Sequence, residues 1–219
     1  VARLNFSHGT HEEQKIRMDM VKKLRKECGK HIAILLDTKG PEIRTTAVEE
    51  HIHFKTGDRL MICGNPSAIT TRECVNVTYV DFVKSISIGD NVLFNDGELS
   101  MKIVDKSDDA LVAEVQNDGR LGSRKSVNVP GVHIDLPALT DKDITNIKFA
   151  IEEGVDFIAH SFVRSKNDVK AVQDILDKYH SDIQIISKIE NQEGVDNIDE
   201  IIEASYGIII ARGDLGIEV

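Results

Sequence analysis

The 219 residues suffice for one large domain or two small ones, and with 41% hydrophobic residues they can fill a substantial core. A formal net charge of −10 argues against a nucleic-acid partner, which would need a basic patch. No apolar stretch could span a membrane and no signal peptide is recognisable, so we expect a cytoplasmic protein. The three cysteines lack C-x-x-C spacing, and we therefore expect neither a disulfide framework nor a zinc knuckle.

The chain opens within a predicted strand, residues 1–7, and since it has no starting Met we expect it to be a fragment of a longer protein. Thr10 and Glu13 form a capping-box pattern, which predicts a helix that stops at Gly29. The apolar run 32–36 then predicts a second strand. Its lack of strict alternation is typical of strands that are covered on both faces, as in a parallel sheet.

The helical period disappears between Pro41 and about Pro137. Short strand-like segments replace it, at residues 51–54, 59–63, 75–80, 91–94, 99–104 and 111–115. The run Asn95-Asp96-Gly97 predicts a hairpin, because Asp-Gly tolerates the positive φ of a tight turn. We therefore expect an inserted all-β domain, a small β-barrel over residues 42–134, that could close over a site as a lid.

Helices and apolar runs alternate again from Thr140 onward. Capping-box patterns at Thr140 with Asp143 and at Ser165 with Asp168 predict two helices, and a shorter helix is expected near residues 198–202. The apolar runs start at residues 157, 183 and 208, at intervals of roughly 25 residues, which is the length of one strand-helix unit of an eight-fold barrel.

This alternation predicts an α/β fold, a partial TIM (β/α)8 barrel that carries the inserted β-barrel domain. The barrel would comprise residues 1–41 and 135–219. Five of its strands are recognisable in the chain, so we expect three to lie outside it.

Three of the predicted strands end in polar residues at every second position. These residues are Arg3, Asn5 and Ser7 in the first strand, Lys188 and Glu190 in another, and Arg212 and Asp214 in the last. Residues two apart in a strand share a face, so the polar groups of each strand should converge. The carboxyl ends of parallel strands form the rim where α/β enzymes place their chemistry.

Glu190 and Asp214 could supply two carboxylate oxygens to one Mg²⁺ ion. Alternatively, each acid simply forms a surface salt bridge with the basic residue two positions earlier. Lys188 beside such a site suits a phosphoryl group in transfer, where charge stabilisation does most of the catalysis. It could instead form a Schiff base, although a carboxylate at Glu190 favours the charged ammonium over the free amine.

Further polar residues follow the first two strands. Arg3, Arg44 and Lys39 could bind phosphate oxygens, or could be ordinary solvated charges. Oxygen ligands for a monovalent cation such as K⁺ could come from Asn5, Ser7, Asp37 and Thr38. The ordinary alternative for these four residues is that they hydrogen-bond to one another.

Several long segments, in this order, resemble the pyruvate kinase family. They are residues 1–9 (VARLNFSHG), 36–44 (LDTKGPEIR), 187–191 (SKIEN) and 211–216 (ARGDLG). The resemblance covers the whole chain, including the β insertion. Two positions depart from the common family pattern, Tyr206 and Ser126, and neither is an expected metal ligand.

The resemblance implies transfer of a phosphoryl group from phosphoenolpyruvate to ADP, with pyruvate and ATP as products, by a Mg²⁺- and K⁺-dependent glycolytic enzyme. By motif position, the catalytic residues would be Lys188 and Arg3. Substrate and nucleotide would be bound by Arg3, Arg44, Lys125, Lys188, Gly213 and Asp214. The Mg²⁺ ligands would be Glu190 and Asp214, and the K⁺ ligands would be Asn5, Ser7, Asp37 and Thr38. Glu42 matches the members that depend on K⁺. The full-length protein would be a homotetramer, and this fragment is expected to be inactive alone.

Two rival functions remain open at this point. One is a barrel lyase that uses Lys188 or a metal for enolate chemistry, and trapping of a substrate imine with borohydride would favour it. The other is a fragment that binds nucleotide or metal without catalysis. The phosphate-binding arginines Arg3 and Arg44 favour the phosphotransferase.

Overall fold

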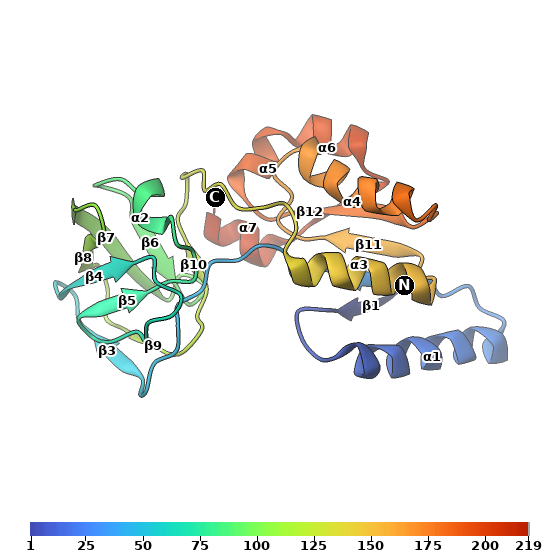
Figure 1. Cartoon of the computed structure of the whole chain (residues 1–219), viewed down its shortest axis with the longest axis horizontal. Coiled ribbons are helices and arrows are strands. Elements are labelled where there is room, and N and C mark those ends of the chain that lie inside the picture. The colour runs from blue at the N-terminus through green and yellow to red at the C-terminus, as the bar shows by residue number, and fades with distance from the viewer. Residues whose placement is uncertain (219) are drawn as a thin grey trace. The chain divides into compact units, whose positions relative to one another are not determined.

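The computed structural model describes residues 1–218, which divide into two compact units. The first unit comprises Val1–Pro41 and Leu136–Leu215, and the second is built on Glu42–Asp135. In Figure 1 the first unit carries the blue and the yellow to red ribbon, and the second the cyan to green ribbon.

A five-stranded parallel sheet forms the centre of the first unit. Its strands follow one another in chain order: β1 (Ala2–Asn5), β2 (Ile34–Asp37), β11 (Phe157–His160), β12 (Gln184–Ile189) and β13 (Gly207–Ile210). All four neighbouring pairs are parallel. Such an order, with helical crossovers between successive strands, is that of a (β/α) barrel, and the sheet is a curled half-barrel. The five predicted barrel strands are therefore confirmed.

Helices connect these strands: α1 (His11–Cys28), α3 (Asp141–Glu153), α4 (Lys166–Lys178), α5 (Gln192–Asp196), α6 (Ile198–Ala204) and, after β13, α7 (Arg212–Glu218). The predicted capping boxes of α1 and α3 are present, and both helices end at a left-handed glycine, Gly29 or Gly154. None of the helices within residues 1–218 has the length and apolar composition needed to cross a membrane.

Two local predictions in this unit are wrong. The predicted helix α4 is present, but Ser165 makes no side-chain capping hydrogen bond at its start: the N–H of Asp168 donates to the Ser165 carbonyl at 3.1 Å, and the Asp168 carboxylate accepts from the backbone and the guanidinium of Arg164. Arg212 and Asp214 lie in the first turn of α7 rather than at the end of a strand. Residues two apart on a helix do not share a face, so the expected convergence of these two side chains is absent.

The core of the first unit lies between the sheet and its helices. Fully buried aliphatic side chains come from the strands, for example Ile34, Leu36 and Ile158, and from the helices, for example Val172 and Leu176. All four residues of β2 are buried, so its three aliphatic residues meet apolar surroundings on both faces of the sheet, and this explains the unbroken apolar run before Asp37.

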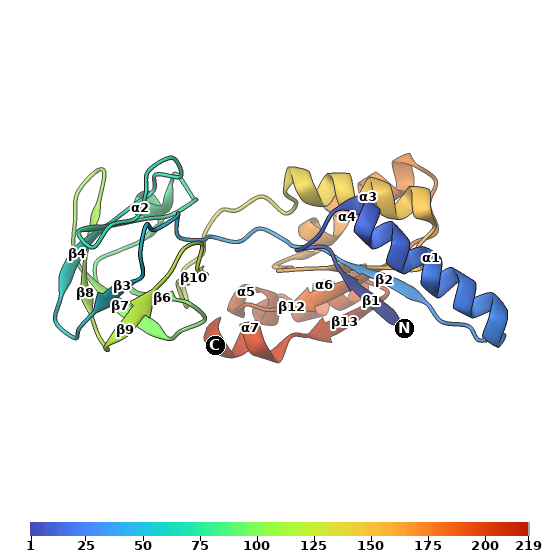
Figure 2. The ribbon, with the colours of Figure 1, turned by 90° about the horizontal axis from the view of Figure 1, so that it is seen from below.

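The second unit consists of strands apart from the four-residue helix α2 (Phe82–Ser85). Six strands form one sheet, in the order β10 (Val127–Asn128), β6 (Asn91–Phe94), β7 (Leu99–Lys106), β8 (Leu111–Val115), β4 (Arg59–Cys63) and β5 (Cys74–Asn76). A separate two-stranded sheet pairs β3 (Ile52–Phe54) with β9 (Gly119–Leu121). Figure 2 shows β9 beside β7. The predicted hairpin joins β6 to β7, with positive φ at Asn95 and Asp96.

Candidate functional site

The candidate site of the first unit lies where its parallel strands end. Asn5 at the end of β1 is the register partner of Asp37 at the end of β2. On its other side, Asp37 is the register partner of Ala159 on β11. Lys188 lies near the end of β12, and Glu190 comes directly after that strand. The parallel register therefore places the predicted polar residues of these strands at one edge of the sheet, as the sequence indicated.

Asp37 is the centre of this cluster. Its carboxylate is 2% exposed and accepts a hydrogen bond from Nε of Arg3 at 2.6 Å, while Nζ of Lys188 lies 3.3 Å from its other oxygen. The side chain of Arg3 is 59% exposed, so one face of the guanidinium remains open to solvent. A buried carboxylate thus fixes two cations that approach it from different strands, and both can still meet an anionic ligand.

Lys188 is the most constrained cation of the cluster. Its ammonium lies 2.8 Å from Oε1 of Glu190, donates to Oγ of Ser161 at 3.0 Å, and faces Asp37. The ammonium group is thus surrounded by one hydroxyl group and two carboxylates. Because its side chain is only 13% exposed, the position of the charge is set by the protein rather than by solvent.

Glu190 is almost fully buried directly after β12. Burial raises the pKa of its carboxyl group, with a further contribution from the negative charge of Asp214, while Lys188 and the backbone N–H of Phe162 act in the opposite direction. The Phe162 N–H donates to Oε2 of Glu190 at 2.7 Å, from a backbone with φ of 57°. Phe162 therefore adopts a left-handed conformation that aims its N–H at the acid.

Ser161 is a member of the cluster that the sequence patterns did not single out. Its hydroxyl accepts from Lys188, donates to the carbonyl of Thr38 at 2.7 Å, and lies 3.3 Å from Asp37. It follows the last residue of β11, where a polar residue after an apolar strand is the same signal that identified the other strand ends. The sequence thus contained a clue to Ser161.

Gly40 and Asp143 hold the end of β2 against this cluster. The buried carboxylate of Asp143 accepts hydrogen bonds from the backbone N–H groups of Lys39 and Gly40 in addition to capping α3. Gly40 has φ of 72°, and a Cβ at this position would lie 2.9 Å from Cβ of Ser161. Glycine is needed here because both the backbone conformation and the close approach exclude a side chain.

The expected magnesium ligands are two acids of unequal exposure, with Glu190 buried and Asp214 exposed in the first turn of α7. They interact electrostatically, since Asp214 contributes to the raised pKa of Glu190. Hard carboxylate oxygens suit Mg²⁺, so the donor set fits this ion. Within residues 1–218 no group of three or more His, Cys, Asp or Glu side chains could hold a metal, and substrate or water oxygens would have to complete the coordination.

The four expected potassium ligands lie along the ends of β1 and β2. Asn5 accepts the N–H of Ser7 through its side-chain oxygen at 2.8 Å, and the hydroxyl of Thr38 accepts the N–H of Ser161 at 3.0 Å. Asp37, the register partner of Asn5, completes a set made of oxygen donors only. Such a set fits a monovalent cation, and the same groups also make the internal hydrogen bonds that were the ordinary alternative.

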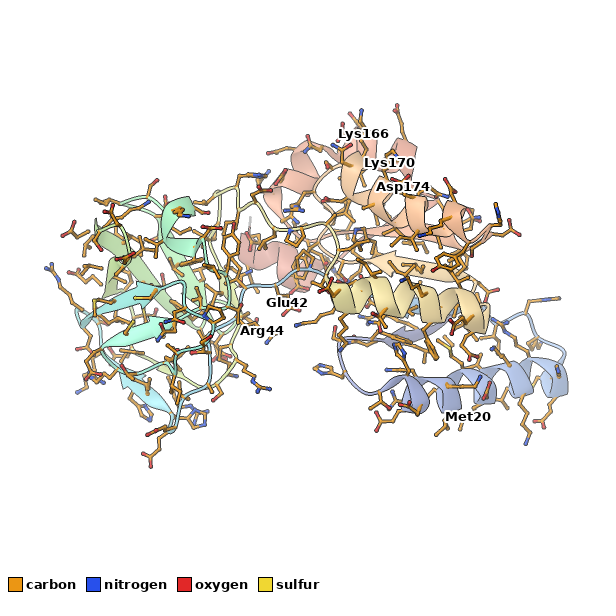
Figure 3. The ribbon with its side chains drawn as sticks, in the orientation of Figure 1. Met20, Glu42, Arg44, Lys166, Lys170 and Asp174 are labelled. Atoms are coloured by element: carbon orange, nitrogen blue, oxygen red, sulfur yellow. The ribbon has the colours of Figure 1, made fainter. Side chains whose placement is uncertain are left out.

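Arg44 and Lys125 belong to the second unit and neighbour each other there. The segments that carry them are joined by hydrogen bonds from Thr45 N to the Lys125 carbonyl at 2.8 Å and from Lys125 N to the Thr45 hydroxyl at 2.9 Å. Nε of Arg44 lies 2.5 Å from the carboxylate of Glu42, and both side chains are labelled in Figure 3. Gly213, the remaining expected ligand, is exposed in the first turn of α7.

Comparisons with known proteins agree on one family. The family model described as pyruvate kinase, barrel domain, matches residues 1–219. A pyruvate kinase of Staphylococcus aureus is 45% identical over 222 residues and one of Bacillus licheniformis 47% identical over 223 residues; each match covers 100% of this chain and 38% of the relative. The chain thus spans 38% of the length of these curated relatives.

A solved structure gives the same result at the level of the fold. The crystal structure of a pyruvate kinase from Cryptosporidium parvum superimposes with a TM-score of 0.95 at 42% sequence identity. The match covers 100% of this chain and 46% of that protein. Sequence and fold therefore point to the same relatives over the entire length of the chain.

Proposed function

Because this chain belongs to the pyruvate kinase family, we propose that the protein containing it transfers the phosphoryl group of phosphoenolpyruvate to ADP and so forms pyruvate and ATP. The observation that carries the proposal is the cluster around Asp37. There the guanidinium of Arg3 and the ammonium of Lys188 are fixed on one buried carboxylate at the rim of the parallel sheet. Two fixed cations suit a reaction whose transition state spreads negative charge over phosphoryl oxygens.

Arg3 and Lys188 have different roles in this proposal. The exposed guanidinium of Arg3 binds the phosphoryl oxygens of phosphoenolpyruvate, and arginine is suited to this task because it binds phosphate through two donors at once. The buried Lys188 ammonium stabilises the phosphoryl group during transfer. The hydrogen bond to Ser161 and the contact with Glu190 hold its charge in place, so little reorganisation is needed when the reaction occurs.

Two cations are part of the proposal. Glu190 and Asp214 would hold Mg²⁺, and Asn5, Ser7, Asp37 and Thr38 would hold K⁺. Mg²⁺ supplies charge neutralisation on phosphoryl oxygens when it is bound. The contribution of the chain is to supply carboxylate, amide and hydroxyl oxygens near the catalytic lysine.

The remaining ligands would bind the nucleotide and the substrate carboxylate. Arg44 and Lys125 of the second unit, which we assign as the inserted β-barrel domain 42–134, would bind the phosphates of ADP. The backbone N–H groups of Gly213 and Asp214 lie in the first turn of α7, where they are available to a carboxylate. We further propose that the whole protein is a cytoplasmic, glycolytic homotetramer and that these 219 residues alone do not turn over.

The proposal is tested by coupled measurement of pyruvate release from the full-length enzyme. We expect release to require ADP and Mg²⁺, and to rise when K⁺ is added. The 219-residue chain, assayed in parallel, should form no pyruvate. Pyruvate release that proceeds equally well without ADP would contradict phosphoryl transfer to a nucleotide.

The lyase alternative is less well supported by the site. Imine formation requires a neutral amine, whereas two carboxylates lie within 3.3 Å of Nζ of Lys188 and favour the ammonium ion. Treatment with borohydride in the presence of phosphoenolpyruvate or pyruvate should leave Lys188 unmodified. A reduced adduct on Lys188 would support the lyase instead.

A further inference from the structure

Two thiols face each other across neighbouring strands of the second unit. Cys63 is the last residue of β4 and Cys74 is the first residue of β5, and their sulfur atoms lie 3.2 Å apart. Both are free cysteines with partly buried side chains. We propose that this pair is an oxidation site, at which a hydroperoxide converts the two thiols into one disulfide bond.

Packing alone does not account for the arrangement. A free cysteine commonly behaves as a small apolar residue, which explains why each of the two is accepted in a half-buried strand. It does not explain why the two sulfurs point at each other. A disulfide bond is about 2.05 Å long, so closure from 3.2 Å shortens the distance between the two sulfurs by about 1.1 Å.

The backbone ladder keeps the two cysteines together. β4 and β5 are parallel, and the register pairs Met61 with Cys74 and Cys63 with Asn76, so the cysteines are diagonal neighbours. Hydrogen bonds from Met61 N to the Glu73 carbonyl and from Val77 N to the Cys63 carbonyl, both 2.9 Å, flank the pair. The thiols are thus held close before any bond forms between them, which favours an intramolecular reaction.

The segment between the cysteines is anchored at both ends. After Cys63, a Cβ at Gly64 would lie 2.4 Å from the carbonyl oxygen of Val80, so this end of the loop is packed against another backbone segment. Before Cys74, a turn is closed by hydrogen bonds between Thr71 N and the Cys74 carbonyl at 2.9 Å and between Cys74 N and the Thr71 hydroxyl at 3.2 Å. A disulfide would therefore close a loop whose ends are already in place.

The hydrogen bond between the sulfurs assigns their roles. The Cys74 thiol donates to Sγ of Cys63, and burial, together with the neighbouring Cys63, raises the pKa of Cys74 to about 12. Cys74 thus keeps its proton. We therefore assign the first attack on the oxidant to Cys63 and the second step to Cys74.

The reaction balances in two steps. The Cys63 thiolate attacks one oxygen of the hydroperoxide; an S–O bond forms, the O–O bond breaks, and protonation of the leaving oxygen gives an alcohol, or water if hydrogen peroxide is the oxidant. Sγ of Cys74 then attacks Sγ of the Cys63 sulfenic acid. The S–O bond breaks, the hydroxide leaves with the Cys74 proton as water, and the two sulfurs have lost two electrons to the peroxide.

Metal binding is a weaker explanation for the pair. A zinc site in a protein takes four ligands, commonly cysteine and histidine. Within residues 1–218, no group of three or more His, Cys, Asp or Glu side chains could hold a metal ion. Besides Cys63, the Cys74 sulfur contacts Oδ1 of Asn76, at 3.9 Å. Two sulfurs without further ligands suit a disulfide rather than a metal centre.

The sequence makes the test direct. Trypsin cleaves after Arg59, Arg72 and Lys84, so Cys63 and Cys74 fall in separate peptides, 60–72 and 73–84. The intact protein is treated with hydrogen peroxide, alkylated and digested without reductant. We expect the two peptides to appear as one linked species, lighter by two hydrogens than their sum, and to separate after dithiothreitol. Separate peptides that are unmodified or carry sulfinic or sulfonic acids would overturn the proposal.

Cys28 provides the internal control. It lies exposed on α1 in the first unit and falls in the short tryptic peptide 27–30. Cys63→Ser and Cys74→Ser should each abolish the linked species, whereas Cys28→Ser should leave its yield unchanged. A disulfide that includes Cys28 would refute the pairing, and the peptide map of the unsubstituted protein decides the question even if a serine variant does not fold.

Discussion

At the scale of single residues, the candidate site depends on one buried charge network. Asp37, Lys188 and Glu190 are each largely removed from solvent, and every one of them contacts an opposite charge. Removing one partner of such a network leaves another charge buried and uncompensated, which is costly. The network can therefore hold its charges in fixed positions, and electrostatic catalysis requires such rigidity.

In the full-length enzyme, Lys188→Met is expected to lower kcat by at least about 100-fold, because it removes the charge proposed to stabilise the transferring phosphoryl group. Binding of ADP, measured by calorimetry, should change little. Lys170→Met is the matched control: Lys170 also pairs with an acid, Asp174, at 2.5 Å, but its side chain is 67% exposed on α4 (Figure 3). An undiminished kcat in Lys188→Met would remove this lysine from the mechanism.

His160 is a buried residue that links protonation to stability. Its imidazole is completely buried on β11, and Asp168, Asp143 and Arg164 are the charged groups that act on it. Burial lowers the pKa of His160 to about 4, although the two acids act in the opposite direction. The folded state therefore binds this proton less readily than the unfolded state, for which 6.5 is the ordinary value.

The free energy of unfolding should consequently fall as the pH drops from 6.5 towards 4, with a contribution from His160 on the order of 3 kcal/mol at the acid end. Above pH 6.5 the imidazole is neutral in both states and contributes no such dependence. Urea unfolding across this range should show a shallower pH dependence for His160→Leu. The exposed His31 supplies the control His31→Leu, which should follow the original protein; a His160→Leu curve parallel to it would disprove the linkage.

At the scale of elements, two capping boxes with the same sequence pattern have different structural importance. Glu13 is exposed and caps only α1, by accepting the N–H of Thr10. Asp143 is fully buried, caps α3, and also accepts the N–H groups of Lys39 and Gly40. The second box thus joins a helix to the end of the strand that carries Asp37.

Asp143→Ala is expected to lower the free energy of unfolding by about 3 kcal/mol or more, because buried N–H groups lose their acceptor. Glu13→Ala, which removes the equivalent residue of the exposed box, should cost about 1 kcal/mol or less. Chemical denaturation of the two variants gives the comparison. Equal losses would show that the contacts of Asp143 beyond its own helix contribute nothing.

At the scale of the whole molecule, the chain contains two units with separate cores. Ile34 on β2 and Ile62 on β4 are both completely buried, one in each unit. Ile34→Ala and Ile62→Ala should each destabilise their own unit by about 2–5 kcal/mol. Hydrogen exchange measured by mass spectrometry should then accelerate only in the strands of the substituted unit. Acceleration of equal size in both units would mean that the chain unfolds as one cooperative block.

The sequence by itself determined the barrel strands, the helices α1, α3, α4 and α6, the β6–β7 hairpin and the family. The strands, the helices and the hairpin follow from local rules, because apolar runs, capping residues and turn residues act over a few positions, whereas the family follows from the resemblance of several long motifs. Two local predictions were wrong: Arg164, four residues before Asp168, binds the carboxylate expected to cap α4, and the chain turns helical at Arg212, where a strand end was expected.

Only the tertiary structure decided which side chains meet. Ser161 joins the cluster because parallel register sets the end of β11 beside those of β2 and β12, and Cys63 faces Cys74 because β4 pairs with β5. These contacts join residues that are far apart in the chain or separated by a loop. Periodicity and capping patterns report only on local neighbours, whereas strand register fixes the distances on which chemistry depends.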